Sequence, residues 1–456
     1  MDKQSGLTTP QSESSSSQTV RENVSKTTPE REQGGLTRDR RKPRISETPP
    51  AAPPAPRLAD YEAIIGKSQV DELRFVASPL KGKTAKMVNS TAVGGGVAEM
   101  LNRLVPLLDE LEIKTGWEVI TGGNDFFEVT KAFHNALHGE EFTLTQHARD
   151  VFMSHTEQNR QRMNFDEDFL VMHDPQPAGL IASKSNSSSR WIWRCHIDLS
   201  HPNPQVWDFL QPMIERYDAA IFSSPAFARS LPIPQALFYP CIDPLSEKNR
   251  ELDEGYIQEV CDNFGVDRSR PIVTQISRFD RLKDPLGVIQ AYKMAKKYVD
   301  FQLVLAGGGA SDDPEGAVVL KEVQEAAGED PDIIILELPP WSALEINALQ
   351  RASTIVVQKS LKEGFGLTVT EALWKSKPTI ASAVGGIPTQ VIDKQTGALV
   401  HSVEGCGYQI RYLLTHPEYG AQLGRNGREH VKENFLMTTN ARRWVLLFRI
   451  LSGLGS

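Results

Sequence analysis

One stretch of the chain decides the fold: Glu363-Gly364-Phe365-Gly366-Leu367-Thr368-Val369-Thr370-Glu371. It follows a β-branched run, residues 352–358, that predicts a buried strand, and it leads into residues 367–375, which predict a helix. The order is therefore strand, glycine turn and helix. Such a turn presents backbone N–H groups at a helix N-terminus, where a phosphate or another polar ligand can bind. We expect Glu363 in the loop and Glu371 in the helix, both facing one crevice.

The same order occurs near the start of the folded sequence. Residues 84–91 predict a strand, the glycines at 94–96 predict a tight turn, and residues 97–111 predict a helix with one apolar face. Because glycines let a backbone approach a ligand closely and the helix dipole favours an anionic group there, we expect this glycine turn to bind a ligand. The alternative is a tight turn without a ligand. The pattern is not G-x-G-x-x-G, so it does not indicate a nicotinamide-binding fold.

Polar side chains follow two further predicted strands. His173 and Asp174 end one of them, and His196 and Asp198 follow the next. Because ligands of open α/β sheets gather beyond the carboxyl ends of the strands, we expect these four side chains to form one pocket for sugar hydroxyls. A structural role is the alternative. No third ligand stands at a suitable spacing, so a metal site is not predicted.

Two basic side chains follow the predicted strand 271–277. Arg278 and Lys283 lie five residues apart in the loop after it. A planar guanidinium and a point-like ammonium can converge on one phosphate or diphosphate. Read alone, the stretch also fits a solvated loop.

Composition restricts the class of protein. A formal net charge of −8 over 456 residues argues against nucleic acid as the main partner. The four cysteines are scattered without a C-x-x-C pair, as expected of reduced thiols in a cytoplasmic protein. No apolar run reaches the roughly 20 residues that a membrane span needs, and no secretory signal is recognisable.

The N-terminal residues differ from the rest. Residues 1–57 are rich in Ser, Thr, Pro, Gln and charge, and we expect a disordered tail there, with a basic cluster at 38–44. Residues 61–77 predict one helix. Beyond it, strands and helices alternate in two halves, which predicts an α/β fold of two Rossmann-like domains facing each other across a cleft.

The order of these motifs resembles one family of enzymes, the retaining GT-B glycosyltransferases of family 4. Arg278, Lys283, the stretch from Glu363 to Glu371 and then Gly385-Gly386 are similar to its donor domain. The closer resemblance is to the trehalose glycosyltransferring synthases and the related retaining trehalose phosphorylases. It is carried by VNSTAVGGGVAE (88–99), TKAFHNAL (130–137), HDPQP (173–177), WRCHIDLS (193–200) and IDPLSEKN (242–249).

The resemblance implies domains and roles. An acceptor-binding domain would span residues 58–265, with a C-terminal helix (437–456) packing back on it, and a nucleotide-sugar-binding domain would span 266–436. Arg278 and Lys283 would hold the donor diphosphate, Glu371 the ribose, and Glu363 the donor sugar. The remaining implied site residues are His173 near the reacting carbon, Gly95, Gly96, Asp174, His196 and Asp198 at the substrates, and Gly364, Phe365 and Gly366 in the donor loop.

The activity implied by the resemblance is a retaining transfer of glucose. The donor would be UDP-glucose or ADP-glucose, the acceptor glucose and the product α,α-trehalose, in a reaction that can be reversible, without an essential metal or another cofactor. A trehalose phosphorylase remains the alternative, because inorganic phosphate would bind the same Arg278 and Lys283. A non-catalytic sugar-binding scaffold and a family 4 transferase with another acceptor also stay open. We expect small-molecule substrates, no membrane contact and a cytoplasmic location, and a homodimer is left open.

Overall fold

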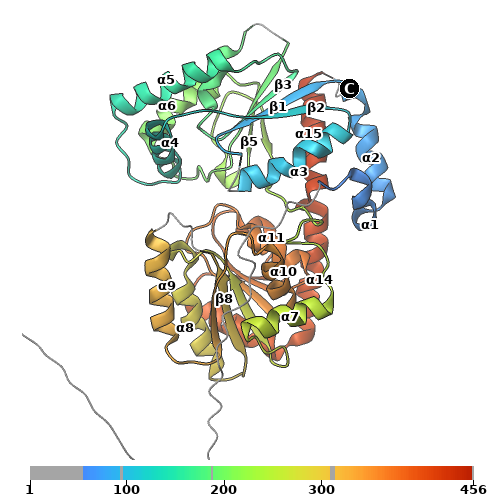
Figure 1. Cartoon of the computed structure of the whole chain (residues 1–456), viewed down its shortest axis with the longest axis vertical. Coiled ribbons are helices and arrows are strands. Elements are labelled where there is room, and N and C mark those ends of the chain that lie inside the picture. The colour runs from blue at the N-terminus through green and yellow to red at the C-terminus, as the bar shows by residue number, and fades with distance from the viewer. Residues whose placement is uncertain (1–54, 93–95, 186–187, 309–313, 454–456) are drawn as a thin grey trace, which may run out of the picture. The chain divides into compact units, whose positions relative to one another are not determined.

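The computed structural model describes residues 55–92, 96–185, 188–308 and 314–453. The predicted tail lies outside the described residues as far as residue 54, and so does Gly95. The described chain carries two parallel β-sheets, one in each half (Figure 1). This confirms the prediction of two Rossmann-like domains.

The first sheet has six parallel strands in the order β2-β1-β3-β4-β5-β6. The strands are β1 (Thr84–Asn89), β2 (Lys114–Val119), β3 (Phe169–His173), β4 (Arg190–Arg194), β5 (Ala219–Phe222) and β6 (Gln235–Leu237). Since β2 lies on one side of β1 and β3 on the other, the strand order reverses between β1 and β3. A ligand crevice is therefore expected beyond the carboxyl ends of these two strands.

Helices cover both faces of this sheet (Figure 1). They are η1 (Leu58–Tyr61), α1 (Glu62–Ile65), α2 (Lys67–Ala77), η2 (Ser78–Leu80), α3 (Gly96–Glu110), α4 (Asn124–Leu137), α5 (Gln146–Arg162), η3 (Ala178–Ser183), α6 (Pro204–Ile214) and η4 (Pro225–Phe227). The expectation of one helix over residues 61–77 was wrong. The helix is interrupted at Gly66, between α1 and α2. The φ of Gly66 is 85°, in the left-handed region that glycine adopts without steric cost.

Alternation along the strands builds the core on each face. Phe169 and Val171 of β3 point into a cluster with α2, α3 and the C-terminal helix, whereas Leu170 and Met172 point into a cluster with α4, α5 and α6. Successive residues of a strand point to opposite faces, so a strand buried on both sides reads as a continuous apolar run.

The second sheet also has six parallel strands, in the order β12-β11-β10-β7-β8-β9. They are β7 (Ile272–Ile276), β8 (Gln302–Gly307), β9 (Ile333–Glu337), β10 (Ile355–Gln358), β11 (Thr379–Ser382) and β12 (Ala398–Val400). Here the order reverses between β7 and β10. The loops that follow these two strands carry Arg278, Lys283 and Glu363, so the fold brings the predicted donor residues together at a switch point.

The helices of the second half pack on both faces of this sheet. They are α7 (Glu254–Phe264), η5 (Arg281–Lys283), α8 (Pro285–Lys296), α9 (Pro314–Ala327), α10 (Ala343–Ala352), α11 (Leu367–Trp374), α12 (Ile387–Gln390), α13 (Val403–Thr415) and α14 (Pro417–Asn434). Within the described residues, no helix combines the length and the apolar character that a membrane crossing needs.

The C-terminal helix α15 (Met437–Leu451) returns to the first half of the chain. Its Phe448 stacks on Phe169 of β3 with the ring centroids 4.1 Å apart. The buried cluster on this face also includes Phe435, Phe365 and Trp374 from the second half. One apolar cluster therefore extends from the first sheet to Phe365, in the loop between β10 and α11.

Candidate active site

A cavity of about 520 Å³ lies where the two switch points meet. The first half contributes α3, α4 and the loops after β3 and β4, and the second half contributes the loops after β7 and β10 and the start of α11. Its lining residues are Gly96, Val97, Met100, His134, Asp174, His196, Pro240, Cys241, Lys248, Ile276, Ser277, Arg278, Lys283, Ile346, Gln358, Glu363, Phe365, Gly366, Leu367, Thr368 and Glu371.

The loop that carries Glu363 is shaped by close backbone contacts. Gly366 is the N-cap residue of α11, and its φ is 81°, a left-handed conformation that glycine adopts without steric cost. Gly385 lies directly below the loop with a φ of 54°, and a Cβ atom there would be 1.7 Å from the carbonyl oxygen of Glu363. The N–H of Gly386 donates to the carbonyl of Gly364 at 2.9 Å. Glycine is therefore required at position 385 for the loop to keep this position.

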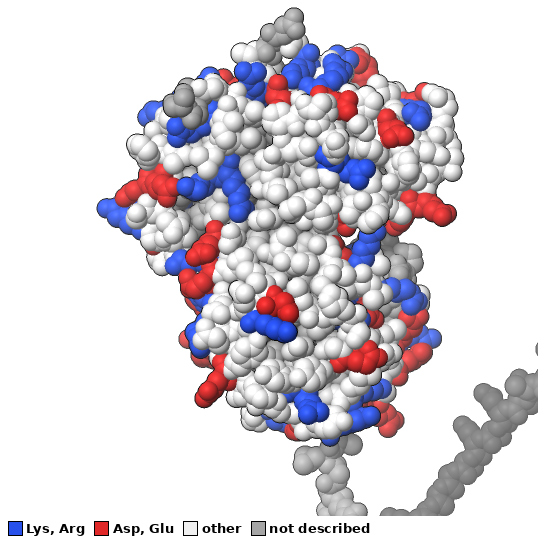
Figure 2. All heavy atoms as spheres, turned by 180° about the vertical axis from the view of Figure 1, so that it is seen from behind, with Lys and Arg blue, Asp and Glu red and all other residues white. Residues whose placement is uncertain are grey.

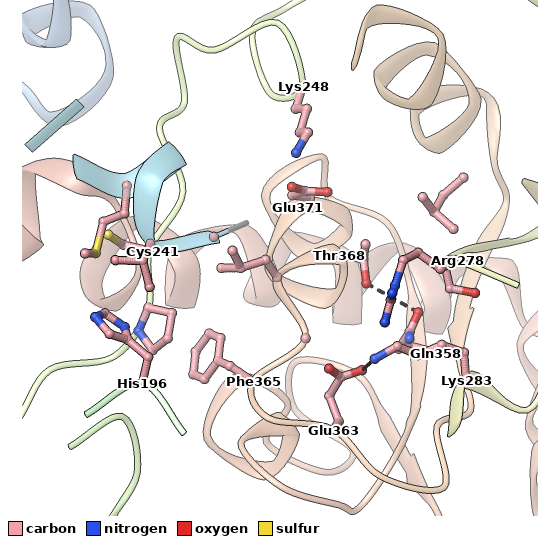
Figure 3. A pocket seen from close by; sticks show the side chains of 18 of the residues that line it. His196, Cys241, Lys248, Arg278, Lys283, Gln358, Glu363, Phe365, Thr368 and Glu371 are labelled. Atoms are coloured by element: carbon pink, nitrogen blue, oxygen red, sulfur yellow. Dashed lines mark hydrogen bonds and ion pairs between the residues drawn. The ribbon is translucent and has the colours of Figure 1, made fainter. Parts of the chain in front are cut away.

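Lys283 and Glu363 form an ion pair inside the cavity. The Lys283 Nζ atom lies 2.7 Å from Glu363 Oε2, and the Ser360 hydroxyl donates to the same oxygen at 3.1 Å. The N–H of Leu361 donates to the carbonyl of Leu282 at 2.7 Å, which fastens the two loops to each other. In Figure 3 the carboxylate lies toward His196, on the side of the first half, and the ammonium toward Arg278.

Arg278 stands at the solvent side of this pair. Its side chain is 58% exposed and lies 3.1 Å from the Asp280 carboxylate. Asp280 also accepts the N–H of Leu282, so the loop that presents Arg278 and Lys283 is held by its own hydrogen bonds. An exposed guanidinium next to a half-buried ammonium is a suitable arrangement for the two phosphates of a diphosphate.

Glu371 lies deeper in the cavity and is only 6% exposed. Burial raises the pKa of its carboxyl group, and the positive charges of Lys248 and Lys375 oppose that shift. Lys375 is buried on the far side and donates to the Asn249 side chain at 3.1 Å. A buried carboxylate in a ligand cavity is suited to accept hydrogen bonds from the hydroxyls of a ligand.

The first half lines the cavity with a wall that includes a neutral histidine, His196, and the carboxyl group of Asp174. His196 Nε2 lies 2.9 Å from His173 Nδ1, and burial together with Arg194 lowers the pKa of both imidazoles, to about 3 for His173. Asp174 accepts the backbone N–H of His196 at 2.7 Å, and burial raises the pKa of its carboxyl group to about 6. Its φ of 67° is unusual for a residue other than glycine. Such strain is frequent at functional sites.

The structure brings most of the predicted residues together. Nine line the cavity: Gly96, Asp174, His196, Arg278, Lys283, Glu363, Phe365, Gly366 and Glu371. Three others do not line it. His173 is buried behind His196, Asp198 accepts the N–H of Ser200, and Gly364 supports the loop through its carbonyl. The sequence missed Lys248, which belongs to a connecting segment, and His134, one turn before the end of α4.

Possible metal ligands and the cysteines were located in the described part of the chain, and of the cysteines Cys241 lines the cavity. Within residues 55–92, 96–185, 188–308 and 314–453, no cluster of three His, Cys, Asp or Glu side chains is arranged to hold a metal ion. All four cysteines fall in these ranges, and each is buried and unpaired.

Comparison with known proteins agrees with this arrangement. Residues 87–229 match the family model described as trehalose synthase, N-terminal domain, and residues 258–430 match glycosyl transferases group 1. The chain is 43% identical to a trehalose synthase of Pyrococcus horikoshii over 87% of this chain and 97% of that protein. The chain belongs to the trehalose synthase family. It is therefore a glycosyltransferase whose chemistry concerns trehalose.

More distant relatives define the limits of the likeness. A trehalose phosphorylase of Pleurotus pulmonarius is 28% identical over 86% of this chain but only 60% of its own length. A solved structure of sucrose-phosphate synthase from Thermosynechococcus elongatus has a TM-score of 0.63 at 17% identity, covering 82% of this chain and all of that one. At that identity the likeness concerns the fold alone, and it agrees with the GT-B architecture predicted from the sequence.

Proposed function

We propose that the protein transfers glucose, with retention of the α configuration, from a nucleoside diphosphate glucose to the anomeric hydroxyl of glucose, which forms α,α-trehalose. The second half would bind the donor and the first half the acceptor. One observation carries the donor class: a cation pair and a buried carboxylate share a single cavity. Phosphates suit Arg278 and Lys283, whereas Glu371 suits the hydroxyls of a ribose. Inorganic phosphate alone would leave Glu371 without a ligand.

The acceptor side supports a neutral sugar. The polar residues that line the described part of this wall are His134, Asp174 and His196, and burial lowers the pKa of both histidines. They can exchange hydrogen bonds with hydroxyl groups but offer no fixed positive charge for a sugar phosphate. The proposal therefore names glucose rather than a phosphorylated glucose.

The ion pair in the cavity matches the charges of the reaction. In an oxocarbenium-like transition state, positive charge grows on the anomeric carbon and negative charge on the leaving phosphate. Glu363 would stabilise the first charge, and Lys283 with Arg278 the second. Because these cations already neutralise the phosphate, the proposal needs no metal ion. A leaving phosphate oxygen could accept the proton of the attacking hydroxyl on the same face, which fits retention without a separate enzymic base.

Product analysis tests the proposal. Purified protein is incubated with glucose and either UDP-glucose or ADP-glucose, and separately with trehalose and inorganic phosphate. Trehalose formed from a nucleotide sugar supports the proposal, and the nucleotide sugar that reacts identifies the nucleobase of the donor. Glucose 1-phosphate formed only from trehalose and phosphate would show a phosphorylase instead. Transfer to an acceptor other than glucose would contradict the acceptor assignment, and sugar binding without turnover would favour a scaffold.

A further inference from the structure

Lys248 reaches the cavity from the segment that connects the two sheets. This segment is fixed to the second half by side chains of α10: the Asn347 amide donates to the carbonyls of Glu247 and Arg250 at 2.8 and 2.9 Å. The carbonyl of the next residue, Asn249, accepts the indole N–H of Trp374 in α11 at 3.3 Å, among other donors. The residues on both sides of Lys248 are therefore held in place, which fixes the point from which its side chain starts.

The ammonium of Lys248 lies between two carboxylates from opposite halves of the chain. Its Nζ atom is 3.1 Å from both oxygens of Glu99 in α3. Figure 3 shows the same Nζ atom pointing at the carboxylate of Glu371 in α11. Burial lowers the pKa of Lys248. The negative charges of Glu371 and Glu99 raise it by more than burial lowers it, so the net pKa lies above its ordinary value. Both carboxylates therefore favour the charged form of Lys248, Glu99 through an ion pair and Glu371 through its nearby charge.

Glu371 depends on such a neighbour because it is buried. A buried carboxylate without a compensating cation takes up a proton, and its pattern of hydrogen bonds then changes. The groups that act on it are the ammonium groups of Lys248 and Lys375, the like charge of Glu99, and the amide of Gln350. Burial lowers the pKa of Lys375, which makes this second cation the easier of the two to lose.

We infer that Lys248 is a positioning residue for the donor site, which keeps Glu371 ionised and oriented to accept the two hydroxyls of the donor ribose. The inference rests on the proposed function, because it takes the ribose of a nucleoside diphosphate as the ligand of Glu371. Lys248 acts through Glu371 and does not reach the reacting atoms. The link to Glu99 also ties the ribose site to α3, whose first residue, Gly96, lines the same cavity.

Binding measurements on full-length protein test the inference. Calorimetry is carried out with UDP and ADP, with the 2′,3′-dideoxy form of whichever nucleotide binds, and with inorganic pyrophosphate. For Lys248→Met, we expect affinity for the nucleoside diphosphate to fall by about ten- to a hundredfold, the value of a hydrogen bond to a charged group. Pyrophosphate affinity is expected to stay unchanged, because pyrophosphate has no ribose.

The dideoxy nucleotide gives the sharper readout. Wild-type protein should bind it much more weakly than the ordinary nucleotide, whereas Lys248→Met should bind both alike. Without Lys248 the pKa of Glu371 rises further, so as the pH is lowered the variant should lose nucleotide affinity at a higher pH than wild-type protein does. Lys248→Arg should restore most of the affinity. Lys321→Met, on a side chain that is 79% exposed, is the matched control.

Three results would overturn the inference: unchanged nucleotide affinity in Lys248→Met, an equal loss for pyrophosphate, or a full dideoxy penalty that persists in the variant. If Lys248→Met fails to fold, Glu99→Gln and Lys248→Arg still decide. Both should keep nucleotide affinity within about threefold of wild type, because each keeps a cation beside Glu371, and a loss of tenfold or more in both would contradict the role assigned to Lys248. If wild-type protein binds neither nucleotide, it is the proposed function that fails.

Discussion

In the proposed reaction Lys283 faces the leaving phosphate, and replacing it by methionine removes this positive charge. The Lys283 side chain is 19% exposed, so its charge acts in a partly desolvated environment. Two unit charges about 4 Å apart interact by about 4 kcal/mol at an effective dielectric constant of about 20. If half to all of a unit charge develops on the phosphate, the lost stabilisation is about 2–4 kcal/mol, which lowers turnover about 30- to 1,000-fold.

The kinetic pattern should distinguish this role from simple binding. The charge that Lys283 stabilises grows in the transition state, so we expect kcat to fall by a larger factor than the donor KM rises. The assay is the initial rate of nucleoside diphosphate release at saturating glucose over a range of donor concentrations. Lys283→Arg should retain more activity than Lys283→Met. Wild-type turnover in a folded Lys283→Met protein would refute the reasoning.

Three further predictions concern the acceptor wall, the donor loop and the core. Because burial raises the pKa of Asp174 to about 6, its carboxylate is present only above that pH, and the glucose KM should rise as the pH falls through about 6 in wild type but not in Asp174→Asn. Gly385→Ala places a Cβ atom 1.7 Å from a backbone oxygen and should abolish activity, whereas Gly364→Ala, with no atom within 4 Å of the new Cβ, should remain active in the same assay. Phe448→Ala removes a fully buried ring and should lower the free energy of unfolding by about 3–5 kcal/mol, measured by denaturant titration.

The residues that line the cavity from the second half were predicted well because their signals are local. A β-branched run followed by glycine or basic residues gives both the strand and the end at which the side chains emerge. The short distance between Lys283 and Glu363 could not be predicted from local signals, because it depends on β7 and β10 being neighbouring strands. Strand order is a property of the whole sheet, and local patterns do not encode it.

The residues that line the cavity from the first half were predicted less accurately, for a physical reason. His173 is the last residue of β3 and remains within the buried sheet, whereas His196 lies two residues beyond β4 and reaches the cavity. A shift of one or two residues at a strand end decides which imidazole lines the cavity. Lys248 lies in the stretch IDPLSEKN (242–249), which carried the family resemblance, but no role was assigned to it, because its position at the cavity depends on tertiary contacts with α10 and α11.

Helix α5 is an element outside the cavity that the sequence did not predict. Residues 146–162 are mostly polar, and the residues of this helix that are buried are Ala148, Val151, Phe152, Thr156 and Asn159. With so few apolar positions, the helical period is weak in the sequence and no helix was predicted there. The helix is nevertheless fixed in the protein, because Phe152 packs against Phe126 and Phe133 of α4.

The most direct test of the proposed reaction is the structure of the product made from a nucleotide glucose labelled with ¹³C at C1 and unlabelled glucose. The proposal predicts one non-reducing disaccharide in which the labelled carbon keeps the α configuration and is joined through oxygen to C1 of the second glucose. NMR reads both properties from the coupling of the labelled anomeric proton and from the correlation across the glycosidic bond. A β-configured labelled carbon, or a disaccharide that keeps a free reducing end, would contradict the proposal.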